Sequence, residues 1–150
     1  MSQSYCNLLY HLVFSTKNRQ DWLRGESSER TQEYLGGAIR SEGGVAIIVS
    51  GTSNHVHILA KLRQDRAMSN ILCRIKSNSS GWIHRTFPSF DQFSWQDGYG
   101  AFTVSPSQVE KVYHYIRDQE EHHRKVSFEE ELVALLKAHG IEYEEKYLWR

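Results

Sequence analysis

The chain contains little cysteine, and its two cysteines suit neither a disulfide framework nor a zinc site. Among its 150 residues only Cys6 and Cys73 are present, and they lie far apart in the sequence. A zinc site built from cysteine usually needs a pair of them separated by only a few residues. We therefore expect both to be buried thiols in a reducing compartment, which points to a cytoplasmic protein.

Long apolar runs are lacking as well. No stretch approaches the roughly 20 apolar residues of a membrane helix, so we expect no membrane span. The N-terminus has no charged region followed by an apolar one, so we expect no signal peptide. With 39% hydrophobic and 24% charged residues, the composition is that of an ordinary globular protein, and the length suits a single domain over residues 1–150.

Net charge is also lacking, which argues against a protein that binds a polyanion over its whole surface. The charged residues are unevenly spread, however. Residues 1–109 carry 11 Lys and Arg against 8 Asp and Glu, whereas residues 110–150 carry 7 against 10. Any contact with nucleic acid should therefore come from local clusters in the first part of the chain.

What the sequence does contain is a clear series of strand patterns. Residues 4–16 alternate between two faces with the period of a β-strand, and one of those faces is clearly apolar. Residues 45–62 are rich in Val and Ile and are interrupted by Gly-Thr-Ser-Asn at 51–54, which predicts two strands joined by a turn. A fourth strand is expected over residues 93–104.

Helical periodicity and end signals predict four helices, over residues 27–41, 67–87, 105–124 and 127–140. The order strand, helix, strand, strand, helix, strand is that of an α+β fold of the ferredoxin-like, or RRM-like, type. In this fold an antiparallel sheet carries helices on one face. The two C-terminal helices follow this unit. The other face of the sheet would then be left open for function.

Residues 54–58 read Asn-His-Val-His-Ile and open the third expected strand. Because side chains alternate along a strand, His55 and His57 point to the same face. Two neighbouring imidazoles can form half of a metal site. Taken alone, the motif is equally well explained by two surface histidines on a half-exposed strand. A second pair, His122-His123, lies on an expected helix, where adjacent side chains diverge by about 100° and make poor joint ligands.

The expected helix over residues 105–124 carries two tyrosines on different sides. Tyr113 falls on the apolar stripe of the helix and should be part of the core. Tyr115 falls on a polar flank, one turn before Gln119. This flank can meet a metal site, although an ordinary solvated helix side explains it better when it is taken alone.

Together these segments resemble the single-tyrosine HUH transposases of the insertion-sequence-200 type, including their REP-associated domesticated relatives. The resemblance covers nearly the whole chain. It rests on four motifs, which are YHLVFSTKNR at residues 10–19, NHVH at 54–57, WQDGYGAF at 95–102 and YIRDQEEHH at 115–123.

The resemblance implies an enzyme that cuts single-stranded DNA at the ends of a mobile element, where the strand would fold into hairpins. Tyr115 would be the nucleophile and would form a 5′-phosphotyrosine link. His55, His57 and Gln119 would bind a divalent ion, Mg²⁺ or Mn²⁺. Members of the family rejoin strands without hydrolysis or ATP, and they are dimers in which the tyrosine helix of one subunit often completes the site of the other.

Contacts with single-stranded DNA are expected from aromatic side chains and local cations. The candidates lie on or just before the second helix and are Arg63, Arg66, Arg74, Lys76 and Trp82. We also expect a homodimer, because no segment of the sequence is predicted to cover the histidine face of the sheet. In that dimer the two sheets would join or abut, and the helix over 105–124 would contact the partner.

Three other functions are compatible with the same residues. The first is a domesticated relative that nicks REP hairpins without mobilising an element. The second is a non-catalytic RRM-like module that binds single-stranded nucleic acid and carries an inert histidine pair. The third is a metal-dependent hydrolase of small phosphoesters, which would work without a covalent intermediate.

Overall fold

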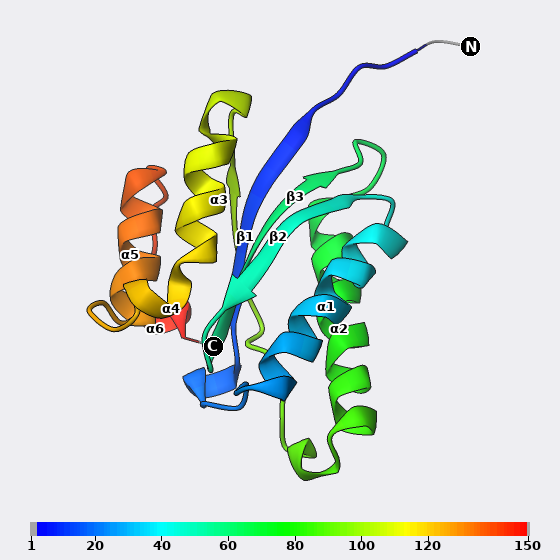
Figure 1. Cartoon of the computed structure of the whole chain (residues 1–150). Coiled ribbons are helices and arrows are strands. Elements are labelled where there is room, and N and C mark those ends of the chain that lie inside the picture. The colour runs from blue at the N-terminus through cyan, green and yellow to red at the C-terminus, as the bar shows by residue number, and fades with distance from the viewer. Residues whose placement is uncertain (1–2, 150) are drawn as a thin grey trace.

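A computed structural model describes residues 3–149, and its centre is a four-stranded sheet (Figure 1). All neighbouring strands are antiparallel, in the order β2-β3-β1-β4. This is the strand order of the ferredoxin-like arrangement, so the predicted α+β fold is confirmed. The strands are β1 (Leu8–Ser15), β2 (Val45–Gly51), β3 (His55–Leu62) and β4 (Gly100–Thr103).

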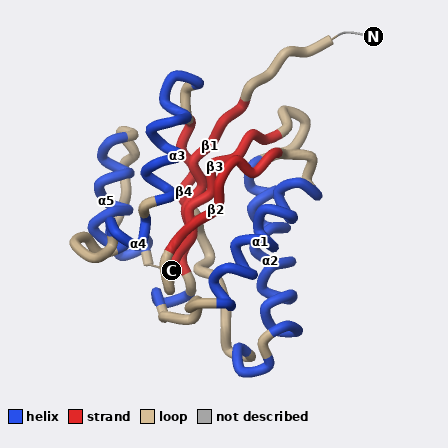
Figure 2. Tube along the Cα trace, viewed as in Figure 1, coloured by secondary structure: helices blue, strands red, loops and turns tan. Residues whose placement is uncertain are grey.

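Helices α1 (Glu26–Ser41) and α2 (Met68–Thr86) lie together on one face of the sheet (Figures 1 and 2). Their apolar stripes meet the alternate residues of β1 and β3 that point to this side, as the strand period requires. The main core forms between these layers. Its fully buried members include Leu12, Phe14, Leu35, Ile39, Ile58, Ile71, Leu72 and Ile75.

The second face of the sheet is covered by the C-terminal helices, so the expectation of an open face is wrong. Helix α3 (Val109–Arg117) packs against β2 and β3, and α5 (Phe128–Ala138) lies beside it on the same side of the sheet (Figure 1). The reason is the apolar spacing of α5, which buries one stripe against the sheet. The resulting second cluster consists of Val13, Phe102, Phe128, Leu132 and Leu136.

The helix expected over residues 105–124 is interrupted. It consists of a 3₁₀ turn at Pro106–Gln108, then α3, then the short α4 (Gln119–His122). Asp118 separates α3 from α4, and its φ of −94° and ψ of 23° are not those of a helix. The break changes the direction of the chain directly before Gln119.

Two expected strands are shorter than their patterns suggested. Strand β1 begins at residue 8 rather than 4, and β4 covers four residues rather than the segment 93–104. Before β4, the chain forms an isolated bridge between Thr16 and Trp95, and Gln96 is hydrogen-bonded to Ser15 at the end of β1. Lys76 donates hydrogen bonds to the carbonyls of Gln96 and Gly98, which holds this stretch as a loop over α2.

Both cysteines are exposed, so the expectation of buried thiols is wrong. Cys6 precedes the first residue of the β1 ladder, and Cys73 lies off the buried stripe of α2. Helix α1 begins after Gly25, and Ser27 binds the backbone of Arg24 instead of capping the helix. A last short helix, α6, spans Glu145–Leu148. None of the helices within residues 3–149 has the length and apolar character needed to cross a membrane.

Candidate active site

His55 and His57 lie on β3 and project toward the face that the C-terminal helices cover, as the strand alternation predicts. Both are fully buried, with 0% of their surface exposed, so they are not surface histidines. Val13 is opposite His57 in the ladder and belongs to the cluster under α5. The intervening Val56 instead joins the core beneath α1 and α2. The two imidazoles therefore share one face of the sheet, as the alternation of the strand predicted.

Gln119 and Tyr115 reach the same place from α4 and α3. The carbonyl oxygen Oε1 of Gln119 lies 3.1 Å from Nε2 of His55. The ring of Tyr115 has its centroid 5.9 Å from that of His57, and the side chain is half-buried. Tyr113 is only half-buried and belongs to neither core cluster, so the expectation that it is part of the core is wrong. The structure therefore brings together all four residues that the resemblance assigned to catalysis and metal binding.

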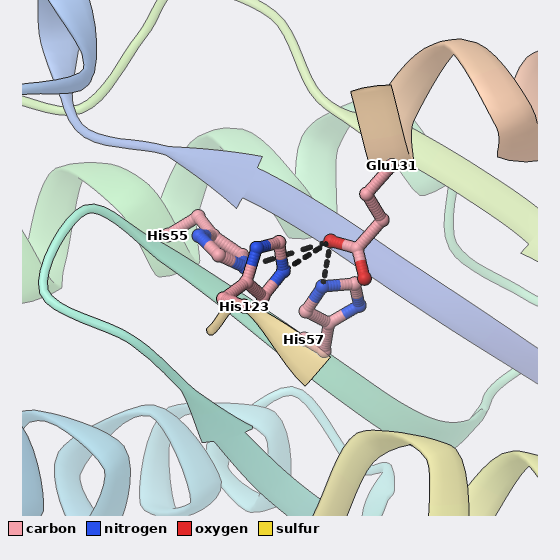
Figure 3. Close-up of side chains that lie close together, drawn as sticks. All are labelled: His55, His57, His123 and Glu131. Atoms are coloured by element: carbon pink, nitrogen blue, oxygen red, sulfur yellow. Dashed lines mark hydrogen bonds and ion pairs between the residues drawn. The ribbon is translucent and has the colours of Figure 1, made fainter. Parts of the chain in front are cut away.

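Glu131 lies at the centre of the cluster, and the sequence analysis missed it. It comes from α5 and is 2% exposed. Its Oε1 lies 2.9 Å from Nε2 of His57 and 3.0 Å from Nε2 of His123 (Figure 3). Its Oε2 accepts a hydrogen bond from the Gln119 amide at 3.0 Å and another from the hydroxyl of Tyr115.

One feature of the sequence indicates that Glu131 faces the protein interior, namely its position next to the apolar stripe of α5. Glu131 belongs to a run of three glutamates in the first turn of α5, where acidic residues are common because they favour a helix N-terminus. Phe128 precedes it by one helical turn and Leu132 follows it directly, and both are buried. A carboxylate beside such a stripe is turned toward the protein rather than toward solvent.

Two further histidines complete the surroundings of this cluster. His11, on β1, has Nε2 2.7 Å from Nδ1 of His57. His123 enters the cluster just after α4, whereas its neighbour His122 is 33% exposed and no closer than 3.5 Å to Glu131. Only one member of the His122-His123 pair therefore points directly into the cluster.

The cluster has the composition of a metal site. His55, His57, His123 and Glu131 each offer one ligand atom, and these atoms all lie within 4.8 Å of one another. Imidazole nitrogens and carboxylate oxygens are ordinary ligands of divalent metal ions. The carbonyl oxygen of Gln119 is a further candidate ligand because it faces His55.

Burial sets the charge of several groups in this cluster. Burial, with a smaller contribution from the nearby His57, lowers the pKa of His11 and of His55 to about 3. Both rings are therefore neutral at pH 7. Burial alone would raise the pKa of Glu131, but hydrogen bonds from His123 and His57 hold it well below its usual range. The cluster thus contains an ionised carboxylate close to the neutral rings of His11 and His55.

Tyr115 is a neutral phenol in this arrangement. Burial raises its pKa above the usual value, and the hydrogen bond to Glu131 together with the charge of that carboxylate raises it further. On its other side Tyr115 lines a groove of about 480 Å³ whose walls include Lys111 and Lys125 together with Asp118 and Glu121. The hydroxyl is therefore held from inside while the residue is reachable from a groove of mixed charge.

The residues predicted to contact DNA lie on or just before α2, on the opposite side of the sheet from the cluster. Each has a partner within the chain. Arg63 pairs with Asp65, and both Arg66 and Arg74 pair with Glu42. Lys76 binds the backbone carbonyls of residues 96 and 98, and Trp82 stacks on Tyr34. Burial lowers the pKa of the lysine to about 8. Their contact with DNA stays a prediction for Arg63, Arg66, Arg74, Lys76 and Trp82.

Comparison with known proteins identifies a family and several solved structures with a similar fold. Residues 4–119 match the family described as "Transposase IS200 like". A candidate transposase from Deinococcus radiodurans R1 is 22% identical, with a TM-score of 0.65 over 79% of this chain and 96% of that one. A REP-associated tyrosine transposase bound to a REP hairpin is 13% identical, with a TM-score of 0.56 over 83% of this chain and 72% of that one. No curated protein matches the sequence.

Proposed function

Since the chain belongs to the family of IS200-like transposases, we propose that it cuts and rejoins single-stranded DNA through a covalent 5′-phosphotyrosine intermediate. The observation that carries this proposal is the convergence of Tyr115, Gln119 and the histidine pair. His55 and Gln119 are 64 positions apart in the sequence, yet their polar atoms are in hydrogen-bonding range inside the protein. The proposed nucleophile and the proposed metal ligands thus lie close to one another, which supports the proposal.

In the cutting step the phenol oxygen of Tyr115 attacks the phosphorus of the scissile bond. A bond forms between that oxygen and phosphorus, the bond to the 3′ oxygen breaks, and the strand leaves with a free 3′-OH. A free phenol has a pKa near 10, so its ionisation at pH 7 costs about 4 kcal/mol. Glu131 accepts the hydrogen bond of the hydroxyl and is in position to take the proton as the new bond forms.

His55, His57 and Gln119 would hold the divalent ion, Mg²⁺ or Mn²⁺, which when bound polarises the scissile phosphate and stabilises the leaving oxygen. The donor set fits such an ion, because neutral imidazole and a carboxamide bring no charge of their own. Rejoining is the reverse reaction, in which a 3′-OH attacks the phosphotyrosine and frees Tyr115. The covalent link conserves the energy of the bond, so no ATP is needed.

The proposed partner is single-stranded DNA with hairpin ends. The groove beside Tyr115 supports this, because it reaches the proposed nucleophile and its Lys111 and Lys125 can each bind a phosphate, although Asp118 and Glu121 line it too. The REP hairpin bound by one of the similar structures supports a hairpin substrate. The same likeness favours one alternative, a domesticated enzyme that nicks REP hairpins without mobilising an element.

The homodimer and the cytoplasmic location stay predictions. One reason for expecting a dimer has gone, since α3 and α5 of the same chain cover the histidine face. The remaining support is the family resemblance and the edge position of β2 in the sheet.

The proposal is tested by incubating the protein with labelled single-stranded DNA from its own locus and either Mg²⁺ or Mn²⁺. A denaturing gel should reveal a protein–DNA adduct. Tyr115→Phe should bind the DNA and give no adduct, whereas the control Tyr113→Phe should still give it. Binding without any adduct would favour the non-catalytic module, and turnover of small phosphoesters without an adduct would favour the hydrolase.

A further inference from the structure

We propose that His123 and Glu131 complete the metal site with His55 and His57, giving three imidazoles and one carboxylate that select a divalent transition-metal ion over Mg²⁺. The proposal extends the proposed function and rests on it only for the metal-binding role of the histidine pair. The two added ligands lie beyond residue 119, where the match to the family ends.

The distances in the cluster suit a single shared ion. Donor atoms bonded to one ion at about 2.1 Å stand roughly 3.0–3.5 Å apart. Oε1 of Glu131 lies 3.5, 2.9 and 3.0 Å from Nε2 of His55, His57 and His123 respectively. All three rings turn a nitrogen toward this carboxylate oxygen (Figure 3).

The rings are held by their other nitrogens, as metal-binding histidines usually are. Nδ1 of His123 lies 2.7 Å from the backbone carbonyl of Val126, which can only accept a hydrogen bond. This bond places a proton on Nδ1 and leaves Nε2 as the nitrogen that can bind an ion. Nδ1 of His55 is held by two neighbours, Oδ1 of Asn54 at 2.8 Å and Oγ1 of Thr52 at 2.9 Å. Both rings thus direct Nε2 toward Glu131.

His57 follows a related pattern through another histidine. Its Nδ1 lies 2.7 Å from Nε2 of His11, which is buried on the neighbouring strand. This contact fixes the plane of the ring and directs its Nε2 to Glu131. His11 is therefore a positioning residue for the metal site.

The ring nitrogens and their oxygen neighbours are already within reach of one shared ion at the centre of the cluster. The amide nitrogen of Gln119 donates to Oε2 of Glu131, which turns the amide oxygen toward Nε2 of His55 at 3.1 Å. Nε2 of His123 lies 3.0 Å from Oε1 of the carboxylate. Without an ion, protons on the ring nitrogens fill these contacts as hydrogen bonds. A divalent ion would displace those protons and bind the nitrogens and oxygens together.

The donor set also determines the class of ion. Mg²⁺ prefers oxygen ligands, dehydrates reluctantly and usually keeps several waters. Imidazole suits first-row transition metals, and a carboxylate suits Mn²⁺ as well. Three imidazoles and one carboxylate should therefore bind Mn²⁺ more tightly than Mg²⁺.

The experiment is a calorimetric titration of Mn²⁺ into the metal-free full-length protein in the absence of DNA. Glu131→Gln keeps the shape of the side chain and removes its charge. His123→Asn can keep the hydrogen bond to Val126 while removing the ligand nitrogen. Each should lower the Mn²⁺ affinity more than about 100-fold, because loss of an outer partner alone typically costs 10–100-fold. The control Glu130→Gln makes the same chemical change at the exposed neighbouring position and should leave the affinity unchanged.

Circular dichroism and melting without metal establish that each variant is folded, and either variant alone suffices for the test. Unchanged Mn²⁺ affinity in a folded variant, or a higher affinity in Glu131→Gln, would overturn the proposal. Mg²⁺ displacing Mn²⁺ at equal concentration would overturn the selectivity. Intact Mn²⁺ binding without any DNA adduct would refute the proposed function alone, whereas adduct formation with unchanged affinity in both variants would refute this inference alone.

Discussion

At the residue scale, the cluster is governed by how completely it is buried. His55 and His57 have no exposed surface, and Glu131 has almost none. Charged and polar groups in such a place need partners, since water cannot supply them. Every substitution here therefore affects folding as well as chemistry, and the two effects have to be measured separately.

His57→Ala illustrates this point. Were the sheet face open, the change would leave folding intact, but the structure predicts a loss. The substitution removes the partner of both His11 and Glu131 inside the protein. Breaking a buried pair of this kind typically costs about 3–5 kcal/mol, and urea unfolding in a chelator should detect it. His114→Ala, on the exposed side of α3, is the control and should stay within about 0.5 kcal/mol of the wild type. Equal stability of the two variants would contradict the burial of His57.

The pH dependence of stability follows from His11 and His55. Burial lowers the pKa of each in the folded protein from 6.5 to about 3. Between these values the unfolded chain binds more protons than the folded one, so stability should fall as the pH drops from about 6.5 toward 3. The slope is at most about 1.4 kcal/mol per pH unit for each histidine.

This dependence can be measured by urea unfolding of the metal-free protein at several pH values. His11→Gln retains an amide near His57 and removes one of the two titrating rings, so its profile should be about half as steep. A profile that is flat, or one that rises toward acid, would show that the rings are charged in the folded state.

At the element scale, α5 completes the candidate site by supplying Glu131 and by covering the histidine face of the sheet. It brings Glu131 to the histidines and buries its stripe in a small cluster separate from the main core. Elements held by such satellite clusters open more readily than those in the main core. We expect backbone amides in α5 to exchange hydrogen faster than those in β3.

Leu132→Ala sharpens this prediction. Truncating a buried leucine typically costs about 2–5 kcal/mol, and here the loss should fall on the satellite cluster. Mass-spectrometric hydrogen exchange should therefore accelerate in residues 128–138 and remain unchanged in α2. Leu135→Ala, at a less buried position of the same helix, is the matched control with a smaller effect. Uniform acceleration across the sheet would mean that α5 unfolds only with the whole molecule.

The sequence predicted some parts of this architecture because their causes are local. Strand alternation gave the shared face of His55 and His57, and helical spacing put Tyr115 and Gln119 on one side. The position of Glu131 could not be predicted in this way, since it depends on α5 returning over the sheet. The start of β4 likewise depends on Lys76, a distant residue that binds the preceding loop.

At the scale of the whole molecule, the open question is assembly. Strand β2 is at the edge of the sheet, and Val45 and Ile47 on it are exposed hydrophobic side chains. An edge of this kind can pair with a second copy of the chain. We predict a homodimer at micromolar concentration by sedimentation and a monomer after Ile47→Lys, which adds a charge to the edge. A wild-type monomer would contradict the prediction.

The central claim is that Tyr115 forms a covalent link to DNA, and mass spectrometry of the trapped adduct tests it most directly. After reaction with single-stranded DNA and a divalent ion, nuclease and protease digestion should leave a nucleotide on the peptide that contains residues 113–119. Fragmentation should assign the added mass to Tyr115, whose hydroxyl meets Glu131 inside the cluster. A nucleotide on Tyr113, or an adduct that persists in Tyr115→Phe, would contradict the account.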